Sequence, residues 1–309
     1  MSKNNISGDN INIKNLYWSG RRKVSYSFIA PAFIILLILA IGPMIFMFWN
    51  AFRSWQLAIP APAKFIGFGN FIDLFKDARF WNAFSNTVLL IIVGIIIQSL
   101  IGLGIALLLK DKFKLRNVVV ALILIPVLIA PVVIGLNWKL LLNDQFGPIN
   151  YFLNLIGVHG PLWLSSNRFW GLLSILIVDT WQWTPFVALV LLAGLEGIPN
   201  QVYEAADVDG AKPFRVFFKV TLPLLKPMFA LIVLLRIIFI FRIYDPVVIL
   251  TGGGPGTATE TLSVLTYSTG LKYLNIGYAM SMGVLQIIFM IIVANVFLKL
   301  TGNNKNTGA

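Results

Sequence analysis

The chain has 309 residues, of which 58% are hydrophobic and only 12% charged, and its formal net charge is +12. A soluble domain would have about 25% charged residues, so this composition excludes an ordinary soluble protein. There is no cysteine and a single histidine, which excludes disulfides, thiol catalysis and clustered Cys/His metal sites. The basic residues flank apolar runs and form no continuous basic face, so nucleic acid is not an expected partner.

Apolar runs of about 20 residues recur along the chain and predict an all-α, polytopic membrane helix bundle with six transmembrane helices. Residues 1–23 are expected to form a flexible tail that ends in three basic residues. The first run is too long for a signal-peptide core and lacks a clear cleavage site, so an uncleaved span is expected. One membrane domain then occupies 24–300, and 301–309 form a polar tail. The expected spans are about 28–49, 84–109, 118–142, 169–194, 228–250 and 275–300.

The distribution of basic residues predicts the orientation. With both termini in the cytoplasm, fifteen of the 24 Lys and Arg residues fall in cytoplasmic segments and seven in outer segments. This excess agrees with the positive-inside rule. In the third span, Pro126 and Pro131 predict a kinked membrane helix, since neighbouring helices can satisfy the carbonyls that a proline frees.

The polar segment 195–227 lies between two apolar runs, and the orientation places it in the cytoplasm. A short helix is expected from Asn200, which can cap it, to a stop at Gly210. Ala205 and Ala206 are small enough to admit a partner backbone closely. Acidic side chains offer hydrogen-bond acceptors to a basic partner; they are Glu204, Asp207 and Asp209.

A second short helix is expected to restart at Lys212-Pro213. Its apolar residues predict a face that lies on the membrane bundle; they are Phe214, Phe217, Phe218 and Leu222. From these residues alone, an amphipathic surface segment that binds nothing remains an equal alternative.

A specific motif favours docking. Glu204-Ala205-Ala206, then Gly210, then Val220-Thr221-Leu222-Pro223 resembles the EAA loop of permease subunits in ATP-binding cassette importers. Val220 departs from the usual isoleucine. Segments 65–87, 181–199 and 244–262 resemble the maltose-type sugar permeases of carbohydrate uptake class 1, and the likeness covers about 24–300.

The resemblance implies a bacterial cytoplasmic (inner) membrane protein that forms half of a pathway for a sugar or oligosaccharide. Its implied partners are a second permease chain in a heterodimer, two cytoplasmic ATP-binding subunits, an extracytoplasmic solute-binding protein and membrane lipid. ATP and Mg would bind to the partner subunits, and no cofactor to this chain. The implied coupling residues are Glu204, Ala205, Ala206, Asp209, Gly210, Leu222 and Pro223.

The glycine-rich segment 251–261 is the natural candidate for a phosphate cradle, but it lacks the GK[ST] ending of a P-loop and the topology places it outside. It is expected to be a flexible outer loop that, by resemblance, contacts the solute-binding protein.

Polar and aromatic residues inside or next to the spans are candidates for a sugar path, since polar groups in a membrane are costly and sugars stack on aromatic rings. Two alternatives stay open: the aromatic residues belong to the interfacial belt, or the carboxylates pair with arginines. Two arginines in one span also allow an acidic, uronate-type saccharide. The candidates are Asn137, Asp179, Trp181, Gln182, Trp183, Arg236, Arg242, Tyr244 and Asp245.

Two other classes of protein remain to be weighed. An ion-coupled secondary transporter often has paired internal repeats with broken helices, and the sequence shows no convincing repeat. A membrane enzyme would need a cluster of catalytic His, Cys or carboxylate residues, and none is evident.

Overall fold

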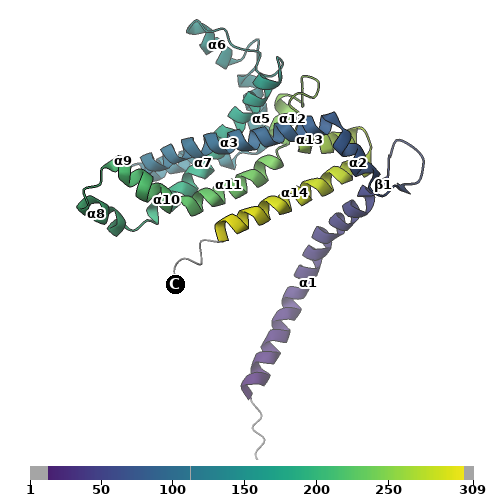
Figure 1. Cartoon of the computed structure of the whole chain (residues 1–309), viewed down its shortest axis with the longest axis horizontal. Coiled ribbons are helices and arrows are strands. Elements are labelled where there is room, and N and C mark those ends of the chain that lie inside the picture. The colour runs from purple at the N-terminus through teal and green to yellow at the C-terminus, as the bar shows by residue number, and fades with distance from the viewer. Residues whose placement is uncertain (1–12, 112, 303–309) are drawn as a thin grey trace, which may run out of the picture.

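A computed structural model describes residues 13–111 and 113–302, and this part of the chain is mainly helical (Figure 1). The α-helices are α1 (Ile13–Ala51), α2 (Gly69–Lys76), α3 (Ala78–Lys110), α4 (Arg116–Leu128), α5 (Pro131–Leu141), α6 (Pro148–Leu155), α7 (Arg168–Glu196), α8 (Asn200–Val208), α9 (Pro213–Val216), α10 (Leu222–Leu224), α11 (Lys226–Phe241), α12 (Asp245–Leu250), α13 (Leu262–Tyr267) and α14 (Ile276–Gly302). Two π-helical turns, η1 (Phe217–Thr221) and η2 (Ser268–Lys272), interrupt the later helices. Strands β1 (Arg53–Ser54) and β2 (Lys64–Phe65) pair antiparallel, with Arg53 opposite Phe65.

Among the described residues, four helices are long and apolar enough to cross a membrane, and two bent helix pairs raise the number to six if each pair counts as one span. The all-α membrane bundle is therefore confirmed, and the six-span count stays a prediction. The expectation of a flexible tail over 1–23 is wrong for its second half, because α1 begins at Ile13. Residues 1–12 and 303–309 lie outside the described part of the chain.

In Figure 1, α3, α7, α11 and α14 form the body of the bundle, and α1 diverges from it. Helices α8 and α9 lie at one end of this body, whereas α2 and β1 lie at the opposite end. In the spanning part of α1, from Pro31 to Ala51, the most apolar window has no buried residue.

The core of the bundle is the contact between α3 and α7. Gly102 lets the two helices approach closely, since a Cβ atom there would lie 2.7 Å from Val187 Cγ1 and 3.1 Å from the Ala188 nitrogen. One turn later Ala106 is fully buried. Small residues of this kind mark close helix packing in membranes.

Replacing Gly102 with alanine is expected to destabilise the bundle by about 1–3 kcal/mol, the usual cost of overpacking. Gly104→Ala is the matched control, because a Cβ at Gly104 meets nothing within 4 Å. The thermal unfolding midpoint in detergent should fall for the first variant and stay unchanged for the second. Equal midpoints for the two variants would contradict the packing argument.

The third expected span is broken rather than kinked. Helices α4 and α5 meet at 93° across a gap of two residues, so the prediction of one kinked helix over 118–142 is wrong. Pro131 starts α5, and Ile129 and Ala130 before it are extended, with ψ of 137° and 135°. A proline disfavours the helical conformation in the preceding residue, and α5 then turns away to pack against α12.

The fifth expected span, 228–250, is shorter than predicted. Helix α11 ends at Phe241, and α12 begins at Asp245 with Pro246 in its first turn. Proline is favoured at a helix start because it has no N–H to place. On the other side of α11, the segment Pro213–Leu224 meets it at 57°. Helix α11 is therefore a short helix that meets the preceding segment at an angle and is separated from α12 by a break.

Candidate functional site

Helix α8 ends in a Schellman motif that fixes the direction of the chain. The amide N–H of Ala211 donates to the Ala206 carbonyl at 3.0 Å, and that of Gly210 donates to the Asp207 carbonyl at 3.0 Å. Gly210 has φ of +67°, a conformation that favours glycine. The predicted stop at Gly210 is confirmed. The predicted cap is wrong, since Pro199 occupies the N-cap position and Asn200 is already helical.

The two faces of α8 differ sharply. Val202, Tyr203 and Ala206 face the bundle, where Ala206 is buried and the other two pack against an apolar cluster. The opposite face is exposed and carries Glu204, Ala205, Asp207, Val208 and Asp209. Ala206 is thus closed to a partner, and of the two alanines expected to admit one, Ala205 alone is exposed.

The second arm of the segment runs through α9, η1 and α10. The Phe214 and Phe218 rings contact each other, tilted by 50° with centroids 4.6 Å apart, and both are exposed. The prediction that they lie on the bundle is therefore wrong for these two rings. Phe217 and Leu222 are half-buried. Leu225, directly after α10, is fully buried and joins the arm to the start of α11.

At the end of the bundle where α3 and α7 meet α8, basic side chains tie the helices together. The Arg116 guanidinium donates to the Leu109 carbonyl at 2.6 Å through Nε and forms an ion pair with Glu196 at the end of α7. The Lys110 ammonium lies 4.0 Å from the centroid of the Tyr203 ring on α8. Sequence reasoning did not single out Lys110 or Tyr203, because neither belongs to the motif.

A polar cluster lies deep in the bundle, at the meeting of α3, α7 and α11. Asp179 and Arg236 are 6% and 0% exposed, and Arg236 Nη2 lies 2.5 Å from Asp179 Oδ2. Gln98 bridges them: its Nε2 donates to Asp179 Oδ2 at 2.7 Å, and its Oε1 accepts from Arg236 Nε at 2.7 Å. The alternative that Asp179 pairs with an arginine is therefore confirmed.

Gln98 was missed from the sequence. It is the one amide in the apolar run 88–109, and the cost of a polar group in a membrane could have identified it. The structure also leaves buried polar atoms without a hydrogen-bond partner in the described part of this region: Arg236 Nη1, Thr180 Oγ1 and Thr184 Oγ1. These atoms can still accept or donate to a group that enters the bundle.

The two tryptophan candidates follow Asp179 on α7, and Trp183 lies against the cluster. The Trp183 ring stacks on Phe239 with centroids 5.0 Å apart and lies 5.2 Å from the Arg236 guanidinium carbon. Trp181 is 42% exposed and meets Trp138 of α5 edge to face at 5.8 Å. Gln182 is buried, and its amide lies 3.4 Å from the Ile129 carbonyl at the break between α4 and α5.

The remaining candidates lie elsewhere. Asn137 is exposed on α5, where its amide donates to the Val133 carbonyl of the same helix at 3.0 Å. Arg242 is exposed at the end of α11. Tyr244 packs against Tyr267 with centroids 4.9 Å apart, and Asp245 begins α12. The structure thus gathers Asp179, Arg236 and Trp183 into one cluster and does not bring these four residues into it.

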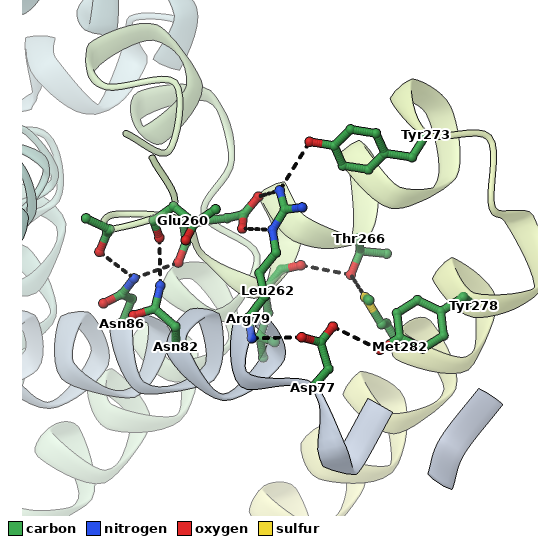
Figure 2. A network of polar contacts seen from close by, with 12 residues as sticks. Asp77, Arg79, Asn82, Asn86, Glu260, Leu262, Thr266, Tyr273, Tyr278 and Met282 are labelled. Atoms are coloured by element: carbon green, nitrogen blue, oxygen red, sulfur yellow. Dashed lines mark hydrogen bonds and ion pairs between the residues drawn. The ribbon is translucent and has the colours of Figure 1, made fainter. Parts of the chain in front are cut away.

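Side chains from other parts of the chain hold the glycine-rich segment 251–261 in place, as Figure 2 shows. Glu260 is 3% exposed and accepts from Arg79 Nε at 2.7 Å and from Nη2 at 2.8 Å. Asn82 donates to the Thr257 carbonyl at 2.6 Å, and Asn86 to the Ala258 and Glu260 carbonyls at 2.9 and 2.8 Å. The expectation of a flexible loop is wrong, because the first turns of α3 hold it by hydrogen bonds.

Bonds within this segment add to its order. The hydroxyl groups of Thr251 and Thr259 lie 2.8 Å apart, and the Thr259 hydroxyl donates to the Gly254 carbonyl at 2.8 Å. Over 13–111 and 113–302, no group of three or more His, Cys, Asp or Glu residues could hold a metal ion.

Comparison with known proteins supports a transport role. Residues 98–303 match the family model described as "Binding-protein-dependent transport system inner membrane component". The chain is 34% identical over 281 residues to the sulfoquinovosyl glycerol transport system permease protein SmoG of Agrobacterium fabrum, with 91% of each chain covered. It is 34% identical over 255 residues to the trehalose/maltose transport system permease protein MalF of Thermococcus litoralis, covering 82% of this chain and 84% of that one.

A structural comparison agrees. A chain in the crystal structure of a bacterial alginate ABC transporter, in complex with an alginate pentasaccharide-bound periplasmic protein, matches with a TM-score of 0.80. The match covers 94% of this chain and 98% of that chain at 22% identity, which shows the shared fold.

Proposed function

This chain belongs to the family of binding-protein-dependent transport system inner membrane components, and we propose that it forms half of a sugar pathway, completed by a second, different permease chain. It is the permease subunit of a sugar importer of the ATP-binding cassette type, a multi-pass inner membrane protein without an ATPase site of its own. This membership sets aside the ion-coupled secondary transporter. An extracytoplasmic binding protein would deliver the sugar, and two cytoplasmic subunits would hydrolyse ATP. Both termini of this chain would lie in the cytoplasm.

The observation that carries this proposal is the division of α8 into a packed face and an exposed acidic face. Glu204, Ala205 and Asp209 would bind a basic groove of the ATP-binding subunit, where charge-assisted hydrogen bonds are strong. The inward residues Tyr203 and Ala206 would transfer its displacement to the bundle. A ligand moves a conformational equilibrium only through its differential affinity for the two states. Binding of ATP to the partner subunit would change its affinity for α8 in the two conformations of the permease.

The route into the membrane would run along the second arm. Leu222-Pro223 lie in α10, next to the π-helical turn η1 and shortly before the buried Leu225. Bends at such turns concentrate motion at defined positions. A displacement of α8 would therefore tilt α11, which carries Arg236 of the interior cluster.

The sugar of this importer would be neutral. The only arginine buried deep in the described bundle is Arg236, and its charge is balanced by Asp179. This pair would therefore present no net positive charge to an acidic saccharide. The exposed Trp181 ring and the half-buried Trp138 ring, with Asn137 nearby on α5, would offer a stacking face and an amide. Gln182, Trp183, Arg242, Tyr244 and Asp245 would line or support the path.

Two measurements test the proposal. Affinity purification of the tagged chain should recover an ATP-binding subunit and a second permease chain. In vesicles that hold the recovered complex and its binding protein, neutral di- and oligosaccharides should compete for ATP-driven uptake at least tenfold better than uronate oligosaccharides of equal length. Purification without an ATP-binding subunit would overturn the assembly, and stronger competition by uronates would overturn the neutral substrate.

A further inference from the structure

Helix α3 contacts three parts of the chain to which a role has been given: α8, the buried ion pair and the glycine-rich segment. It has 33 residues and no proline, and at 1.5 Å per residue it is about 50 Å long. In contrast, α1, α4 and α7 each contain proline within the helix. An uninterrupted helix that packs along its length against α7 moves as a stiff element.

The inner end of α3 contacts α8 through a cation–π pair. Lys110, the last residue of α3, holds its ammonium 4.0 Å from the Tyr203 ring centroid. On the same ring, the hydroxyl lies 3.3 Å from Thr221 Oγ1 of η1. Tyr203 lies on the inward face of α8, so a partner bound to the outward face leaves it in contact with the bundle.

The middle of α3 carries Gln98, which is hydrogen-bonded to both members of the buried ion pair. The outer end carries Arg79, Asn82 and Asn86, which together hold the glycine-rich segment 251–261 (Figure 2). Leu262, just after that segment, donates its amide N–H to Thr87 Oγ1 at 3.0 Å. The exposed part of the segment, around Thr257, is thus held by the helix whose other end touches α8.

We infer that α3 transmits the displacement of α8 to the glycine-rich segment, and that Tyr203 and Lys110 are the positioning residues that make this connection. The inference rests on the proposed docking of α8 to an ATP-binding subunit. It adds a second route beside the arm through Leu222-Pro223, and this route ends at the outer surface. Because coupling between two sites is reciprocal, a partner seated on segment 251–261 would act back on α8 through the same helix.

The absence of cysteine from the chain permits a direct test in the full complex, assembled with cysteine-free partner subunits. One spin label is placed at Thr257→Cys in the outer segment and another, in a separate sample, at Gln201→Cys in the first turn of α8; both positions are exposed. The probe is Mg-ATP with vanadate. We expect it to change the mobility of both labels.

Removal of the contact should separate the two responses. In Tyr203→Leu and in Lys110→Gln, the response at position 257 relative to that at 201 should fall about two- to fivefold, the factor that a surface cation–π contact supplies. Tyr203→Phe keeps the ring and should retain the response. In the double variant Tyr203→Leu with Lys110→Gln, the relative response at position 257 should fall no further than in either single variant. This is expected for two residues that act through one contact.

Failure of the α8 docking and failure of the α3 connection would give different results. A label at 201 that ignores Mg-ATP and vanadate would overturn the proposed docking of α8 itself. If the label at 201 responds, the docking stands. The role of α3 would then be overturned by either of two results at position 257: no response at all, or an equal response in Tyr203→Leu, Lys110→Gln and Tyr203→Phe.

Discussion

Replacing Arg236 with methionine is expected to destabilise the protein by about 3–5 kcal/mol, because it leaves the Asp179 carboxylate buried without its counter-charge. Gln98 would still donate one hydrogen bond to that carboxylate, which offsets only part of the loss. The thermal unfolding midpoint of the purified complex, and the yield of monodisperse protein, should both fall strongly.

The control for this prediction is the double variant Arg236→Met with Asp179→Leu. Replacement of both members of a buried pair by apolar residues is often neutral or even stabilising, so most of the lost stability should return. Transport should not return with it, if the pair also sets the relative position of α7 and α11. A single Arg236→Met variant as stable as the parent protein would show that the ion pair does not hold these helices together.

Replacing Gly210 with valine should abolish most ATP-driven uptake while ATP hydrolysis continues. A side chain in the left-handed conformation costs about 1–2 kcal/mol, and a β-branched side chain is especially unfavourable there. The Schellman motif that ends α8 would open, so the helix and the arm after it would no longer keep a fixed angle. The ratio of sugar transported to ATP hydrolysed in vesicles measures this loss.

Gly210→Asn is the matched comparison, since asparagine tolerates the left-handed region. It should keep most of the coupling ratio. No Cβ contact obstructs either side chain, because nothing lies within 4 Å of a Cβ built at Gly210. The two variants therefore differ in backbone preference rather than in steric clash, and equal coupling in both would contradict the role of this turn.

The helical framework follows from the sequence where the cause is local. The apolar runs gave the long helices α3, α7 and α14, because length and apolarity suffice to indicate a membrane helix. Gly210 correctly predicted the end of α8, because the tolerance of glycine for a positive φ does not depend on distant residues. The prolines at 126 and 131 indicated a disturbance, but its size of 93° depends on the packing of α5 against α12, which no local rule contains.

The parts of the site that escaped prediction depend on long-range contacts. Asp179 and Arg236 were both suspected, yet their pairing joins residues 57 positions apart. Glu260 and Arg79 are 181 positions apart, so glycine content alone misread their loop as flexible. Gln98 stands alone in its apolar run, so the sequence does not indicate its role. That role depends on the two charged side chains that the fold brings next to it.

The contacts that hold segment 251–261 limit the insertions and deletions that it can accommodate. The carbonyl groups of Thr257, Ala258 and Glu260, and the Glu260 carboxylate, are bonded to side chains on successive turns of α3. An added residue among them would shift these pairings out of register. The connection between β1 and β2 is the opposite case, since residues 56–62 are exposed throughout. Epitope tags and inserted domains therefore belong in the strand connection, and the glycine-rich segment has a length fixed by the helix beneath it.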